Sequence, residues 1–85
     1  MNSTAVDSAA LTNIAYDDSL QVLRLEFQSR AVYEYAGVPP GVYQALLEAP
    51  SKGGYFNRAI RGYFPYSLVS RDQADEPPPA LRATR

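Results

Sequence analysis

Hydrophobic and polar residues alternate along the first half of the chain, as they do in β-strands that are buried on one face only. The clearest example places Leu23, Leu25 and Phe27 on one side, with charged residues between them. A later strand, rich in β-forming residues, ends at Gly37, which is followed by Val38 and then by two prolines that cannot continue a sheet ladder. The pattern predicts three antiparallel strands, at residues 11–16, 21–27 and 31–36.

The spacing of apolar residues changes to three and four after Pro40, which is typical of amphipathic helices. Pro40 suits the first turn of a helix, and Pro50 ends the segment because the residue before a proline resists the helical conformation. Ser51 can cap a second helix, which ends at Gly62. Because an apolar sheet face must be covered, the sequence predicts an α+β fold: a three-stranded antiparallel sheet followed by two short helices packed on one face.

Both ends of the chain are expected to lie outside the folded domain. Residues 71–85 combine many charges with three consecutive prolines and are predicted to form a disordered tail. Residues 1–8 are predicted to form a flexible N-terminus, and residues 63–69 to form an extended segment lying over the core. A single domain is therefore expected at residues 9–70.

The composition removes several classes of function. The chain contains no cysteine and no histidine, so it lacks thiol chemistry as well as the commonest general base and metal ligand. We therefore expect a protein that is not an enzyme and that holds neither a cofactor nor a metal. The sequence shows neither a secretory signal nor an apolar run long enough to span a membrane. These features predict a cytoplasmic protein, which we also expect to be a monomer.

The distribution of charge is more informative than the net charge of −1. Residues 51–71 contain four basic residues, no acidic residue and five aromatic residues, a combination typical of nucleic-acid-binding surfaces. In this interpretation the basic side chains contact phosphates, the asparagine donates hydrogen bonds and tyrosines stack on bases. A solvated polar helix face would explain the same basic residues. The candidate site residues are Lys52, Asn57, Arg58, Arg61, Tyr33, Tyr35 and Tyr63.

Tyr33 and Tyr35 lie on the same side of their strand because their positions differ by two. The turn before the strand decides which side this is. A two-residue turn made by Ser29 and Arg30 would leave both rings on the open face, whereas a three-residue loop would turn them into the core. The sequence leaves both arrangements open, so the two rings are interpreted either as core packing or as a stacking platform for bases.

Several short motifs stand at fixed distances from one another. They are Leu23-x-Leu25-x-Phe27, Tyr33-Glu34-Tyr35 and Ser51-Lys52-Gly53-x-Tyr55-Phe56-Asn57. Together they resemble the KTSC domain, a small module named after the C-terminus of some lysyl-tRNA synthetases that also occurs as free-standing bacterial proteins. The resemblance covers residues 6–66, essentially the whole folded part. Arg30 departs from it, because we expect the family to place a glycine in this hairpin turn.

The resemblance brings no catalytic residues and, through the attachment to a synthetase, suggests RNA as a ligand. We therefore expect a small non-catalytic binding module whose partner is RNA, either tRNA or a single strand, and which acts with or alongside a larger protein partner. The alternative is a protein–protein interaction module, in which exposed aromatic side chains form an apolar patch with a polar rim.

Overall fold

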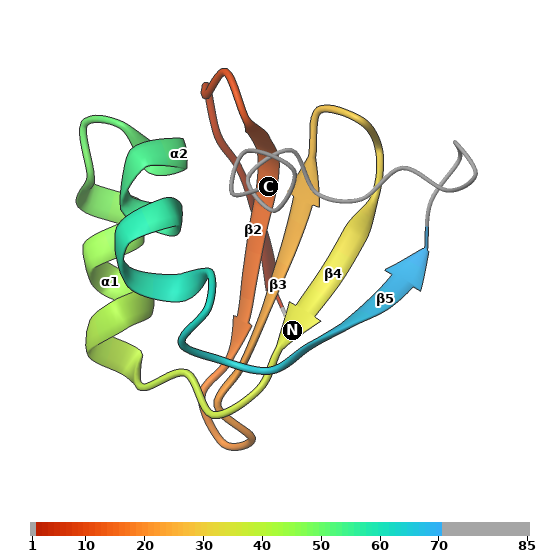
Figure 1. The fold of residues 1–85 in the computed structure, drawn as a ribbon, viewed down its shortest axis with the longest axis vertical. Coiled ribbons are helices and arrows are strands. Elements are labelled where there is room, and N and C mark those ends of the chain that lie inside the picture. The colour runs from red at the N-terminus through yellow and green to blue at the C-terminus, as the bar shows by residue number, and fades with distance from the viewer. Residues whose placement is uncertain (1, 71–85) are drawn as a thin grey trace.

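The computed structural model describes residues 2–70 and shows one antiparallel sheet with a layer of helices on one face (Figure 1). The strands lie in the sheet in chain order, and the helices come between the last two strands in the sequence. The elements are β1 (Asn2–Ala5), β2 (Leu11–Asp17), β3 (Val22–Phe27), β4 (Val32–Tyr35), α1 (Pro40–Glu48), α2 (Lys52–Tyr55), the π-helical segment η1 (Phe56–Ile60) and β5 (Tyr66–Ser70).

The α+β class with an antiparallel sheet and two helices is confirmed, but the sheet has five strands, so the prediction of three is wrong. β1 lies within the predicted flexible N-terminus at residues 1–8, and β5 lies in the segment that was expected to cover the core. Both are edge strands, held by backbone pairing to β2 and β4, and such pairing needs no apolar pattern. The predicted disordered tail, residues 71–85, lies outside the described residues.

The core lies between the helix layer and the sheet. Alternation along β3 turns Leu23 and Leu25 toward the helices and turns Arg24 toward the opposite face, where it pairs with Glu34 at 2.6 Å. The helix layer therefore covers an apolar face, while the other face of the sheet is polar. The buried cluster consists of Leu11, Ile14, Leu23, Leu25, Phe27, Ala31, Tyr33, Tyr35, Val38, Leu46, Phe56 and Ile60.

The hairpin between β3 and β4 closes with a three-residue loop. The N–H of Arg30 donates to the C=O of Phe27 at 2.8 Å, and the N–H of Phe27 donates to the C=O of Ala31 at 2.9 Å. Arg30 takes a left-handed backbone conformation, with φ of 73°. This loop sets the register of β4 so that Tyr33 and Tyr35 face the core, which decides between the two arrangements that the sequence left open.

The second helix begins and ends where the sequence predicts. The Ser51 hydroxyl accepts a hydrogen bond from the N–H of Gly54 at 3.1 Å, which caps the N-terminus. The helix continues from α2 into η1, where the N–H of Arg61 donates to the C=O of Phe56, five residues earlier, at 2.9 Å. Gly62 then takes φ of 85° and ends the helix.

Candidate functional site

Tyr33 and Tyr35 are core residues, with only 5% and 1% of their surface exposed. The ring of Tyr35 meets Phe56 edge to face at 5.6 Å between centroids, and the ring of Tyr33 meets Phe27 in the same way at 6.0 Å. Rings that pack in this manner are not accessible to bases. The expectation that these two tyrosines form a stacking platform is therefore wrong, because the three-residue hairpin loop turns them inward.

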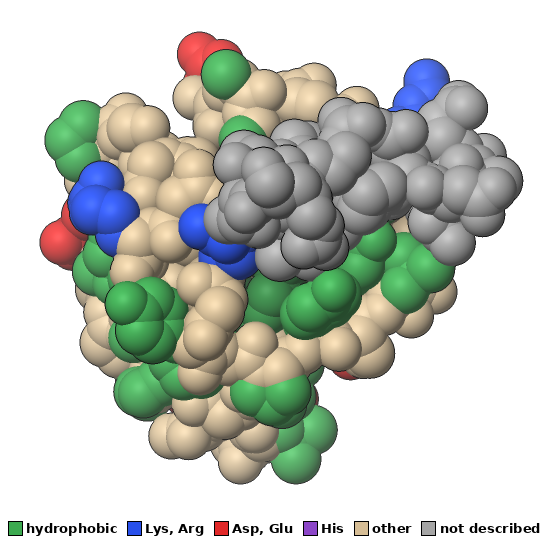
Figure 2. Space-filling view, viewed as in Figure 1, with side chains coloured by type: hydrophobic (Ala, Val, Ile, Leu, Met, Phe, Trp, Pro, Cys, Tyr) green, Lys and Arg blue, Asp and Glu red, His purple; other side chains and the backbone are tan. Residues whose placement is uncertain are grey.

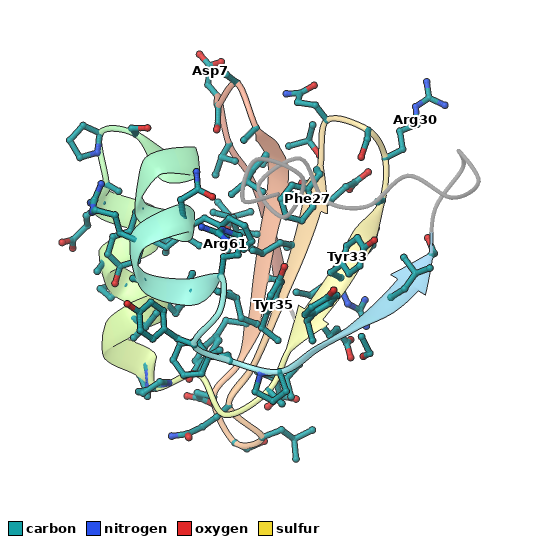
Figure 3. The ribbon with its side chains drawn as sticks, in the orientation of Figure 1. Asp7, Phe27, Arg30, Tyr33, Tyr35 and Arg61 are labelled. Atoms are coloured by element: carbon teal, nitrogen blue, oxygen red, sulfur yellow. The ribbon has the colours of Figure 1, made fainter. Side chains whose placement is uncertain are left out.

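The Tyr35 hydroxyl is buried and has no hydrogen-bond partner within residues 2–70. Burial raises the pKa of this hydroxyl well above its ordinary value, and the neighbouring Tyr66 and Tyr33 contribute to the same shift. Figure 3 shows Tyr33 and Tyr35 rising from β4 on the face of the sheet that carries the helices. Tyr35 therefore remains neutral, and its role in the described part of the chain is packing.

Lys52, a candidate phosphate ligand, is tied to the helix layer. Its Nζ donates to the C=O of Ala49 at 3.0 Å, and so satisfies a carbonyl at the C-terminal end of α1. The next residue is Gly53. A Cβ atom at this position would lie 3.2 Å from Cβ of Ala10, so the position favours glycine. Together with the Ser51 cap, these contacts give the Ser-Lys-Gly motif a structural role at the junction of the two helices.

The three remaining candidate residues of the second helix make two separate contacts. Nε of Arg61 donates to Oδ1 of Asn57 at 3.2 Å, and the guanidinium of Arg58 lies over the ring of Tyr55 at 5.8 Å from its centroid. Asn57 and Arg58 are exposed, as the predicted helix phase requires, and Arg61 is half-buried. Figure 2 shows the basic side chains over the helix layer as two separate groups and not as one continuous patch.

Tyr63 is the candidate stacking residue that the structure leaves accessible. It follows Gly62 in the turn after η1, and its N–H donates to the C=O of Ile60 at 3.0 Å. The side chain is 70% exposed, so the ring is available to a ligand. We name Asn57, Arg58, Arg61 and Tyr63 the η1 surface.

An apolar strand at the sheet edge is the feature that the sequence interpretation missed. Tyr66, Leu68 and Val69 of β5 are 49%, 42% and 43% exposed, although they were expected to lie over the core. The alternating pattern of Tyr66-Ser-Leu68 indicates a strand, but the sequence does not show that these side chains would stay exposed among residues 2–70.

The sequence profile of the KTSC domain matches residues 7–64. The chain belongs to the KTSC domain family. A crystal structure of a KTSC domain protein from Yersinia pestis shares the fold with a TM-score of 0.79 and 30% identity, over 81% of this chain and 97% of that one. The φ of Arg30 now explains the expected glycine in the hairpin, because glycine takes a left-handed conformation without strain.

KTSC relatives occur both as small proteins and as part of much larger ones. An uncharacterised protein from Stutzerimonas stutzeri is 46% identical over 61 residues, which are 72% of this chain and 86% of the relative. A lysine–tRNA ligase from Nostoc punctiforme is 41% identical over 64 residues, which are 75% of this chain but only 11% of the ligase. The similarity to the ligase therefore concerns this module alone.

Two further properties of the KTSC domain bear on its chemistry. Within residues 2–70, no group of three or more acidic side chains is placed to hold a metal ion. In the same part of the chain, every helix is too short or too polar to cross a membrane.

Proposed function

We propose that this KTSC domain is a non-catalytic RNA-binding module and that the η1 surface is its contact site. Arg58 and Arg61 contact phosphates, Asn57 positions Arg61, and Tyr63 stacks on an unpaired base. Lys52 has a secondary part, because its ammonium group is held by α1. The buried Tyr33 and Tyr35 have no part in binding.

One observation carries the proposal: within residues 2–70, no carboxylate neutralises the two arginines of the η1 surface. Among these residues neither arginine forms an ion pair, whereas Arg24 on the opposite face pairs with Glu34. Two like charges three residues apart on a helix destabilise it slightly, so local stability does not account for them. An anionic ligand does account for them.

The geometry of Arg61 suits a phosphate. Its Nε is already bound to Asn57, which fixes the plane of the guanidinium group. The two terminal nitrogens keep donors for an anion, and paired donors on a rigid plane match two phosphate oxygens. Tyr63 lies two residues further along the chain, with an exposed ring that can stack on a base next to that phosphate.

The relatives suggest which RNA to test first. Proteins that carry a similar segment are named lysine–tRNA ligases, so tRNA is the first probe, with a single-stranded RNA as the second. The η1 surface supplies two phosphate contacts and one stacking ring. Binding is therefore expected to be weak and to fall with rising salt.

A titration of the full chain with tRNA at several salt concentrations tests the proposal. Arg61→Ala should reduce the slope of log affinity against log salt by about 1, because one phosphate contact is lost. Arg24→Ala is the matched control, since it removes the same charge from the opposite face and should leave the slope unchanged. Tyr63→Ala should weaken binding by about 1–3 kcal/mol with no change in slope.

Two results would contradict this function. One is the absence of binding to tRNA and to single-stranded RNA at low salt. The other is an equal loss of slope in Arg61→Ala and Arg24→Ala, which would mean that the arginines act only through the total charge of the protein.

Contact with another protein is the second candidate function. It is supported by the exposed apolar side chains of β5. This strand forms one edge of the sheet and shares no residue with the η1 surface. Such a contact would not depend strongly on salt, and this distinguishes it from the binding of RNA.

A further inference from the structure

β5 forms one edge of the sheet, and no described element lies beyond it (Figure 1). All five of its residues are exposed, including Tyr66, Leu68 and Val69. In a small domain with little apolar surface to spare, an exposed apolar strand at an edge marks a surface that binds another chain.

The register of β5 shows which backbone groups are free. The N–H of Ala36 donates to the C=O of Pro65, and Ser67 lies opposite Glu34. In an antiparallel ladder the bonded positions alternate along the strand, so Ser67 directs its N–H and C=O toward β4. Tyr66 and Leu68 therefore direct theirs outward, to the open edge.

The edge of β5 carries one of the usual protections against pairing with another strand, a register shift at Val69 between the pairs Tyr33–Leu68 and Val32–Ser70. Its residues, Tyr66-Ser-Leu-Val-Ser70, include no charged side chain and no proline. The other edge, β1, consists of Asn-Ser-Thr-Ala and offers little apolar surface. Among residues 2–70 the two edges differ, because β5 combines outward backbone groups with exposed apolar side chains.

We propose that β5 pairs antiparallel with β5 of a second copy of this chain, so that two sheets join into one continuous sheet. The two-fold axis passes beside Leu68, which then lies opposite its counterpart. The N–H of each Leu68 donates to the C=O of the other. Tyr66 lies beside the pair of leucines on the same face, and the register shift between Leu68 and Ser70 confines the regular pairing to the residues around Leu68.

A second copy fits this edge better than an unrelated strand does. The outward donors and acceptors of Leu68 complement themselves under two-fold symmetry, as an isologous interface requires. The strand carries no charge, and the net charge of the chain is only −1, so two copies meet without strong repulsion. The helices cover the strands through contacts such as Phe56 with Tyr35 of β4, and β5 projects beyond them (Figure 1).

The interface is small, and this sets the expected strength. Five residues on each side bury less than the roughly 1,200 Å² at the low end of stable specific interfaces, so the dimer should be weak and should depend on concentration. The proposal departs from the monomer expected from the sequence. It is also independent of RNA binding, because the η1 surface and β5 share no residue.

Sedimentation velocity on the full chain across a wide concentration range tests the dimer. Leu68→Lys should raise the dissociation constant at least about tenfold, because two like charges would face each other across the pair. Leu20→Lys is the matched control: this leucine is 69% exposed, lies in the turn before β3 and should not affect assembly. Circular dichroism establishes that both variants are folded.

A cysteine cross-link tests the register, because the chain has no cysteine of its own. Leu68→Cys should oxidise rapidly to a covalent dimer, since directly bonded partners lie about 5.5 Å apart at Cα, within the range of a disulfide. Tyr66→Cys should not, because its counterpart would lie about 14 Å away along the paired strands. Leu20→Cys gives the rate of random collision.

Three results would overturn the proposal. The first is a chain that stays monomeric up to the highest soluble concentration. The second is a dimer that Leu68→Lys and Leu20→Lys weaken equally. The third is a rate of cross-linking in Leu68→Cys that is no higher than the rate in Leu20→Cys. This third result also tests the proposal if Leu68→Lys does not fold.

Discussion

Replacing Phe56 with alanine tests the packing on which the whole domain depends. Phe56 is 1% exposed and stands between the helix layer and the sheet. Its ring meets Phe27 of β3 at 5.5 Å and Tyr35 of β4 at 5.6 Å, both edge to face. The side chain therefore joins the second helix to two central strands, and its removal leaves a cavity where all three meet.

The size of the loss follows from this geometry. A buried phenylalanine replaced by alanine costs about 3–5 kcal/mol, which includes the lost apolar burial, the ring contacts and the cavity. A domain of the size described here has a free energy of unfolding of about 4–10 kcal/mol. Phe56→Ala should therefore remove about half of the stability, and a midpoint drop of more than about 12 °C is expected.

Urea and thermal denaturation followed by far-ultraviolet circular dichroism measure this loss. Asn57→Ala is the matched control, because Asn57 is adjacent but exposed and should cost less than about 1 kcal/mol. Equal losses in the two variants, or a loss below about 1 kcal/mol in Phe56→Ala, would refute the helix phase and the central role of this ring.

Two further predictions concern the backbone and the buried tyrosine. Arg30→Gly should stabilise the domain by up to about 1 kcal/mol, because glycine relieves the strain of the left-handed φ of 73°. Gly37→Ala should destabilise the domain by a similar amount, because Gly37 has φ of 74°. Thermal melts should therefore show a higher midpoint for the first variant and a lower midpoint for the second. The pKa of Tyr35 is raised in the folded state. The free energy of unfolding therefore has its full value below pH 10.0 and falls as the pH rises above 10.0, because the Tyr35 hydroxyl then loses its proton in the unfolded chain but not in the folded one. Urea midpoints at neutral and alkaline pH should show this decline in the wild type and a smaller one in Tyr35→Phe.

The inner strands and the helices could be predicted because their side chains carry the signal. Alternation marks β3, and Ser51 and Gly62 mark the ends of the second helix. β1 and β5 could not be assigned to the sheet, because their place depends on backbone pairing with strands far away in the sequence. The wide turn at the end of η1 has no side-chain signature either.

The candidate site could also be predicted only in part. The helix phase correctly placed Asn57 and Arg58 on the exposed side and Phe56 in the core. The direction of Tyr33 and Tyr35 could not be predicted, because it depends on one residue of loop length. The contact of Lys52 with α1 was equally out of reach, since it depends on how two helices meet.

The position of the helices between β4 and β5 has a consequence for the order in which the molecule assembles. The inner hairpins close across short turns, whereas β5 reaches β4 only after the intervening residues 37–64 have found their place. Closing so long a loop costs entropy that the short turns do not, so the helices and inner strands are favoured to form first. β5 is also the last of the described elements to be synthesised. Any pairing of two copies through its edge therefore waits for domains that are already folded, which keeps this apolar strand out of the early encounters that lead to aggregation.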